Sequence, residues 1–139
     1  MQELKLNHLA IWILVIVHQV VAFVWYSPML FGNQWMALLG KTADDFTGVN
    51  PINYIVAIIT AVAMTYMLAW LFKKLNVNTL LKGVFYAFVF FLCFLFLETL
   101  THGLFSFRPV GLTLIDDGMY LVNFVIAGAV LGSWKKYKK

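Results

Sequence analysis

Glu98 and His102 stand four residues apart in the apolar segment FLCFLFLETLTHGLF, which covers residues 91–105. On a helix this spacing places both side chains on one face, one turn apart. A carboxylate and an imidazole in so apolar a setting could bind an ion, bind a small ligand or relay a proton. The pair does not identify a metal, because neither an HExxH nor a CxxC motif accompanies it. The alternative is structural: Glu98 pairs with Arg108, His102 or a tyrosine and fastens the loops to the helices.

Other apolar segments of the chain also carry polar residues. Asp116, Tyr120 and Asn123 follow i, i+4, i+7 spacing, which is one face of a helix. At about 1.5 Å per residue, Glu98 lies roughly 10 Å from the middle of its helix, a depth similar to that of Tyr26. We therefore expect one polar cluster near one end of a helical bundle. The candidate ligand- or ion-binding residues are Glu98, His102, Tyr26, His18, Asn53, Arg108, Asp116, Asp117, Tyr120 and Asn123.

The composition places these residues in a membrane protein. The chain has 139 residues, of which 63% are hydrophobic and 12% charged. A soluble domain is about 45–50% apolar and about 25% charged. A chain this short could not bury so much apolar surface internally, so the excess must face lipid. We expect a single transmembrane domain over residues 1–139, of the all-α class.

Several function classes find no support in the sequence. The lysines form short clusters beside apolar runs, which indicates contact with lipid headgroups rather than nucleic acid. Ser27, Ser106 and Ser133 have no base at motif spacing, so we expect no enzyme. His18 and His102 differ by roughly 10 Å in depth, which argues against haem. We expect no cofactor, and a metal stays undetermined.

Four apolar segments are close to the roughly 20 residues that cross a bilayer as a helix: 7–26, 52–72, 80–102 and 115–134. Four spans put both termini and the 73–79 link on one side. The other side has only Lys41 and Arg108, so the positive-inside rule predicts cytoplasmic termini. The lysines on the predicted cytoplasmic side are Lys5, Lys73, Lys74, Lys82, Lys135, Lys136, Lys138 and Lys139.

The segment between the first two spans is too apolar for a free loop. We expect it to lie along the membrane interface and to be partly helical. Thr42, with Asp45 three residues later, is typical of a helix start.

Small residues at four-residue spacing predict close helix packing. They could pack helices within the chain, or form an interface with a second copy or a partner membrane protein. The residues concerned are Ala57, Ala61, Thr65 and Ala69 in the second span, and Gly128 and Gly132 in the fourth.

Two stretches resemble a known family. They are VAFVWYSPMLFGNQWMALLG at residues 21–40 and FRPVGLTLIDDGMYLVNFVIAGAVLGSW at 107–134. They are similar to small bacterial membrane proteins catalogued as domain of unknown function family 1761. The resemblance implies a four-span protein of the bacterial inner membrane and implies no activity. Its signature is Trp25, Tyr26, Ser27, Pro28, Phe31, Gly32 and Trp35, for which a structural reason is available: Pro28 ends the span, Gly32 permits a turn, and the aromatic rings anchor the returning chain.

Two hypotheses follow. In the first, an outward-facing polar cavity binds or transports a small ligand or ion. This hypothesis predicts that Glu98 and His102 face the bundle interior, and it fails if both face lipid or water and no cavity is present. In the second, the protein is a structural or accessory membrane protein that binds a partner through its small-residue faces.

Overall fold

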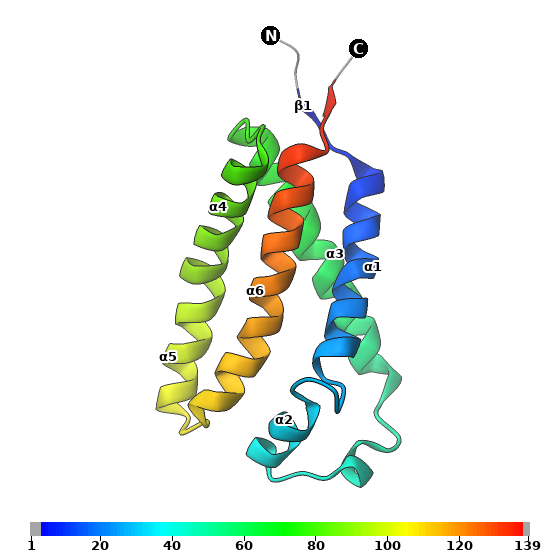
Figure 1. Cartoon of the computed structure of the whole chain (residues 1–139), viewed down its shortest axis with the longest axis vertical. Coiled ribbons are helices and arrows are strands. Elements are labelled where there is room, and N and C mark those ends of the chain that lie inside the picture. The colour runs from blue at the N-terminus through cyan, green and yellow to red at the C-terminus, as the bar shows by residue number, and fades with distance from the viewer. Residues whose placement is uncertain (1–3, 138–139) are drawn as a thin grey trace.

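Four long helical segments run up and down side by side in the computed structural model, which describes residues 4–137 (Figure 1). Lys138 and Lys139, counted above for the membrane orientation, lie outside the described residues. The third segment consists of α4, a π-helical turn η2 and α5. The bounds are α1 His8–Trp25, α3 Pro51–Lys74, α4 Leu80–Phe91, η2 Leu92–Phe96, α5 Leu97–Phe105 and α6 Val110–Ser133.

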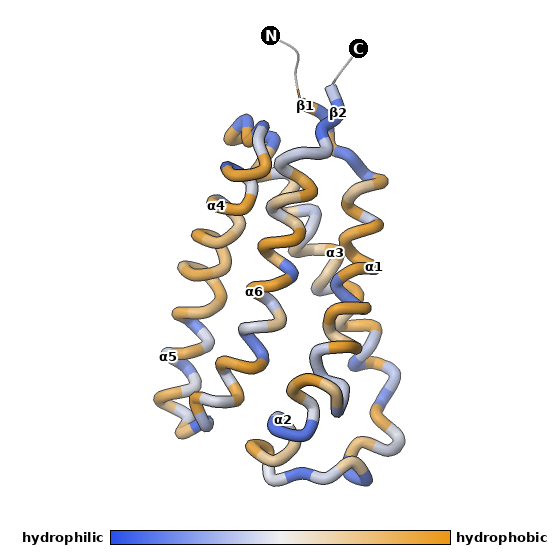
Figure 2. The backbone as a smooth tube through the Cα atoms, viewed as in Figure 1, coloured by the Kyte–Doolittle hydropathy of each residue, from blue (hydrophilic) through white to orange (hydrophobic). Residues whose placement is uncertain are grey.

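All four segments are long and apolar enough to cross a membrane, at 18, 24, 26 and 24 residues. Figure 2 shows hydrophobic residues along these segments and hydrophilic residues mainly at their ends and in the connections. The helices therefore indicate a multi-pass membrane protein, as the composition predicts.

Side-chain caps fix where three of the helices begin. The Asn7 side chain accepts a hydrogen bond from the N–H of Ala10 at the start of α1. Asn50, followed by Pro51, begins α3, and Thr79 begins α4. These boundaries agree with the predicted ones to within two residues.

The last helix begins earlier than predicted, at Val110 instead of residue 115. Pro109, with a φ of −55°, directly precedes it and suits a helix start. The prediction placed the start next to the Asp116–Asp117 pair, which looked too polar for a span. Both acids instead lie in the second turn of α6, where other segments supply their hydrogen bonds.

The third segment is not a uniform α-helix, because η2 interrupts it. A π turn holds one extra residue, which rotates everything after it by about 100° around the helix axis. The rotation decides which side chains of α5 face the bundle, and it could not be predicted from the spacing of Glu98 and His102.

Glycines bring α4 and α6 into direct backbone contact. A Cβ added at Gly128 would lie 2.6 Å from the carbonyl oxygen of Gly83, and one at Gly132 would lie 2.5 Å from that of Thr79. On α3, Ala61, Thr65 and Ala69 are buried, and α3 packs chiefly on α1. The exception in that stripe is Ala57, which is exposed. Most of the small-residue positions are thus used for packing within the chain.

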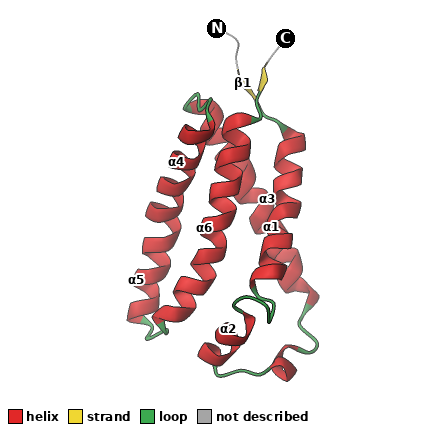
Figure 3. Cartoon of the chain, viewed as in Figure 1, coloured by secondary structure: helices red, strands yellow, loops and turns green. Residues whose placement is uncertain are grey.

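The two ends of the bundle differ in charge. β1 (Leu4–Lys5) and β2 (Lys136–Tyr137) pair antiparallel, which joins the two termini at one end (Figures 1 and 3). This two-residue pair is an addition to the predicted all-α fold. Apart from Lys41, every lysine of residues 4–137 lies at this terminal end, whereas Asp44, Asp45, Glu98, Asp116 and Asp117 belong to elements of the opposite half.

The connection between α1 and α3 is partly helical, as predicted. It contains α2 (Gly32–Leu39) and η1 (Ala43–Phe46). Gly40 ends α2 with a φ of 67°, which glycine adopts without strain. Thr42 precedes η1, and its backbone N–H donates to the Asp45 carboxylate at 2.8 Å, which lowers the pKa of that carboxyl.

Candidate functional site

Asp116 of α6 joins three other segments of the chain at the end opposite the termini. Tyr26 donates its hydroxyl to Oδ1 at 2.7 Å, and Trp35 of α2 donates Nε1 to the same oxygen at 2.9 Å. Arg108 forms an ion pair with Oδ2. Next to it, Trp25 donates Nε1 to the carbonyl oxygen of Ile115 at 2.9 Å. Both oxygens of Asp116 are therefore satisfied by protein donors.

A tight reversal of the chain after α1 makes this arrangement possible. The N–H of Phe31 donates to the Trp25 carbonyl at 3.1 Å, and the N–H of Gly32 donates to Ser27 at 3.0 Å. A Cβ at Gly32 would overlap the carbonyl oxygen of Tyr26, so only glycine fits there. The signature residues thus hold α2 under α6, which gives a structural reason for them.

Asp117, the neighbouring acid, lies in different surroundings. It is 3% exposed, and the hydroxyl of Thr99 on α5 is its hydrogen-bond partner. The π turn rotates Thr99 toward α6 and so creates this contact. No basic side chain among residues 4–137 forms an ion pair with Asp117.

A cavity of about 430 Å³ opens between the two acids and the neighbouring helices. The rings of His18 and Tyr120 lie 5.8 Å apart on its wall. The Gln19 Nε2 atom is buried and has no hydrogen-bond partner within residues 4–137. The lining residues come from α1, α3, α5, α6 and the loop before α6; they are His18, Gln19, Ala22, Tyr26, Ala57, Thr99, Arg108, Asp116, Asp117, Met119 and Tyr120.

The cavity is lined by two carboxylates and by aromatic rings. Side chains of these kinds can hold a small polar ligand. Within the described part of the chain, no group of three or more His, Cys, Asp and Glu residues is placed to hold a metal ion.

Six of the ten candidate residues line this cavity: Tyr26, His18, Arg108, Asp116, Asp117 and Tyr120. Asn53 is exposed at the start of α3. Asn123 is buried, and its amide donates to the Met119 carbonyl at 3.1 Å. It lines a smaller adjoining pocket of about 20 Å³, which shares His18 and Tyr120 with the cavity.

Glu98 and His102 do not line the cavity. Both are exposed on the outer surface of the bundle, so the expectation that they face its interior is wrong. The physical reason is the rotation imposed by η2, which turns Thr99 inward in their place. The structural alternative, in which Glu98 pairs with Arg108, His102 or a tyrosine, is also wrong. Arg108 pairs with Asp116, and no side-chain partner of Glu98 is found among residues 4–137.

The sequence reasoning missed five lining residues: Gln19, Ala22, Ala57, Thr99 and Met119. Gln19 could have been found, because it is a polar residue beside His18 in the first apolar segment. Thr99 gave no such signal. Its hydroxyl also lies 3.0 Å from the Leu95 carbonyl, a bond that threonine commonly makes within a helix.

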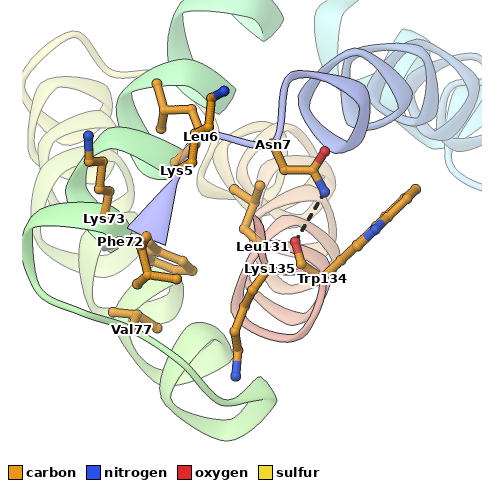
Figure 4. Close-up of a pocket in the computed structure, with 11 residues that line it drawn as sticks. Lys5, Leu6, Asn7, Phe72, Lys73, Val77, Leu131, Trp134 and Lys135 are labelled. Carbon is orange, nitrogen blue, oxygen red and sulfur yellow. Dashed lines mark hydrogen bonds between the residues drawn. The ribbon is translucent and has the colours of Figure 1, made fainter. Parts of the chain in front are cut away.

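A second pocket at the terminal end is an unconvincing ligand site. Its volume of about 30 Å³ matches roughly one water molecule. Figure 4 shows that the amino groups of Lys73 and Lys135 point to different sides of it, so they do not converge on one anion.

Comparison with protein-family models gives a match over residues 9–132 to the family described as protein of unknown function (DUF1761). No curated protein and no solved structure matches the chain.

Proposed function

The chain belongs to the DUF1761 family, and on that basis we propose that it is a bacterial inner-membrane protein whose outward-facing cavity binds a small ligand or ion. One observation carries the proposal. A cavity of about 430 Å³, within the usual range of ligand pockets, is lined by the buried carboxylate of Asp117, which has no ion-pair partner among residues 4–137. A buried ionisable group costs free energy inside a membrane protein. Where one is present, it therefore often belongs to a functional site.

The charge asymmetry supports the orientation. The lysine-rich terminal end belongs in the cytoplasm by the positive-inside rule. The cavity lies at the other end, between α1, α3, α5 and α6, and would then face the outside. The α2–η1 segment and the turn before it would lie along the outer interface; Met29 and Leu30 of that turn are exposed.

Transport would require more than one copy. Toward the terminal end, the space between the helices is filled by Leu68, Phe72, Phe91 and other residues of the apolar core. A single bundle therefore has no polar path beyond the cavity. A transporting form would be a homo-oligomer with the path between copies.

The accessory role receives no specific support from the helix faces. Gly128 packs against α4, and Ala61 is fully buried on α3. A partner would have to dock on a different surface.

Native mass spectrometry of the protein released from detergent tests the proposal. We expect a retained small molecule or ion in the wild type and its loss in Ala22→Phe, which fills the cavity. Ala63→Phe is the matched control, because Ala63 is exposed on α3. A wild-type spectrum without any adduct, or an adduct that survives Ala22→Phe, would contradict a role for this cavity.

A further inference from the structure

The charges that line the cavity are unequal. Arg108 is its basic residue, and it is already paired with Asp116. With His18 neutral, an ionised Asp117 is one negative charge in excess. A ligand that carries one positive charge would balance it.

Asp117 also has unused hydrogen-bonding capacity. An ionised carboxylate can accept about four hydrogen bonds, and the structure supplies Thr99 as its donor. Because the residue is 3% exposed, bulk water does not fill the remaining positions freely. Asp116 differs in this respect, since Tyr26, Trp35 and Arg108 already occupy its oxygens.

Aromatic rings surround the same space. Tyr26, Tyr120 and His18 all line the cavity, and Met119 adds a polarisable thioether. The face of an aromatic ring attracts an organic cation. Rings beside a single carboxylate are the chemistry that recognises an ammonium ion.

We propose that the cavity binds a small organic ammonium ion, with its charge beside Asp117 and its alkyl groups against the rings. This assignment rests on the proposed function and specifies the ligand class. A hard metal cation is a poorer fit, since it needs several oxygen ligands and Asp116 is already occupied.

Isothermal titration calorimetry in a non-ionic detergent tests the ligand class with three ammonium probes: choline, tetramethylammonium and methylammonium. The uncharged isostere of choline, 3,3-dimethylbutan-1-ol, controls for shape and for the hydroxyl group. Asp117→Asn removes the charge with little change of size. Glu98→Gln is the matched control, because it removes the carboxylate of the residue that directly precedes Thr99 but lies on the exposed surface.

We expect choline to bind the wild type and Glu98→Gln alike, and to bind Asp117→Asn about ten- to a hundredfold more weakly. The uncharged isostere should not bind measurably. Equal binding of the isostere, or unchanged choline binding in Asp117→Asn, would overturn the ammonium assignment. A failure of all three ammonium probes to bind would overturn it as well. In each of these cases, an adduct retained in the mass spectrum and lost in Ala22→Phe would still support the cavity as a binding site.

Discussion

Gly128→Ala tests the close contact between helices α4 and α6. The new Cβ would lie 2.6 Å from the Gly83 carbonyl oxygen and 2.7 Å from the Ala87 Cβ, whereas ordinary contacts begin near 3.4 Å. Neither neighbour can rotate away, because one is backbone and the other is the first side-chain atom. Helices α4 and α6 must therefore move apart along their shared face.

Two opposing effects set the size of the change. Alanine is favoured over glycine within a helix by about 1 kcal/mol. Overpacking a tight contact costs about 1–3 kcal/mol, and here it also loosens the packing of neighbouring side chains. We expect a net loss of about 1–2 kcal/mol in the free energy of unfolding.

The assay is reversible unfolding in mixed micelles of mild detergent and SDS, followed by circular dichroism. Gly111→Ala, also on α6, is the matched control. Its Cβ would meet a flexible atom, Cδ1 of Leu38, at 3.0 Å, so the gain in helix propensity should outweigh a small rearrangement. If Gly128→Ala proves as stable as Gly111→Ala, then the close contact between α4 and α6 does not limit stability and the reasoning is wrong.

Three further substitutions test other parts of the structure. Asp116→Asn should destabilise the protein by about 1.5–3 kcal/mol, because charged hydrogen bonds are lost and Arg108 loses its partner; red-shifted tryptophan emission would report the release of α2. Asn7→Ala should cost about 1 kcal/mol, because the cap of α1 and the bond to the Trp134 carbonyl are lost; faster amide exchange at both termini would show it. Ala61→Leu should lower the unfolding midpoint by overpacking the stripe on α3, while Ala63→Leu, on the exposed face, should not. Unchanged stability in Asp116→Asn or Asn7→Ala would argue against the hydrogen bonds that the substitution removes. Unchanged stability in Ala61→Leu would argue against the close packing of α3 at this position.

The four spans could be predicted from the sequence because hydrophobicity over about 20 residues is a strong signal. The capping residues Asn7, Asn50 and Thr79 then place the helix starts closely. The start of α6 was misplaced for a related reason. Its acids have hydrogen-bond partners on other segments, and hydropathy along one segment contains no information about such partners.

The sequence was sufficient to predict at which end of the bundle the polar cluster lies. Depth along each helix depends only on residue count, so Tyr26 and Asp116 were correctly brought to one height. The facing direction on α5 was not predictable, because it depends on η2. No residue type in Leu92–Phe96 requires a π turn, and a helix with regular spacing would have turned a different face to α6.

The adjacent acids of α6 show why the sequence alone could not assign their roles. Successive residues on a helix point about 100° apart, so Asp116 and Asp117 must meet different neighbours. Asp116 accepts hydrogen bonds from Tyr26, Trp35 and Arg108, which leaves it less capacity for a ligand. Asp117 faces α5, where the hydroxyl of Thr99 donates to it and no basic residue among residues 4–137 pairs with it. One carboxylate of the pair therefore holds the α2 segment against α6, and the other remains available to the cavity. Asp117→Asn should consequently weaken ligand binding while lowering the free energy of unfolding far less than Asp116→Asn does.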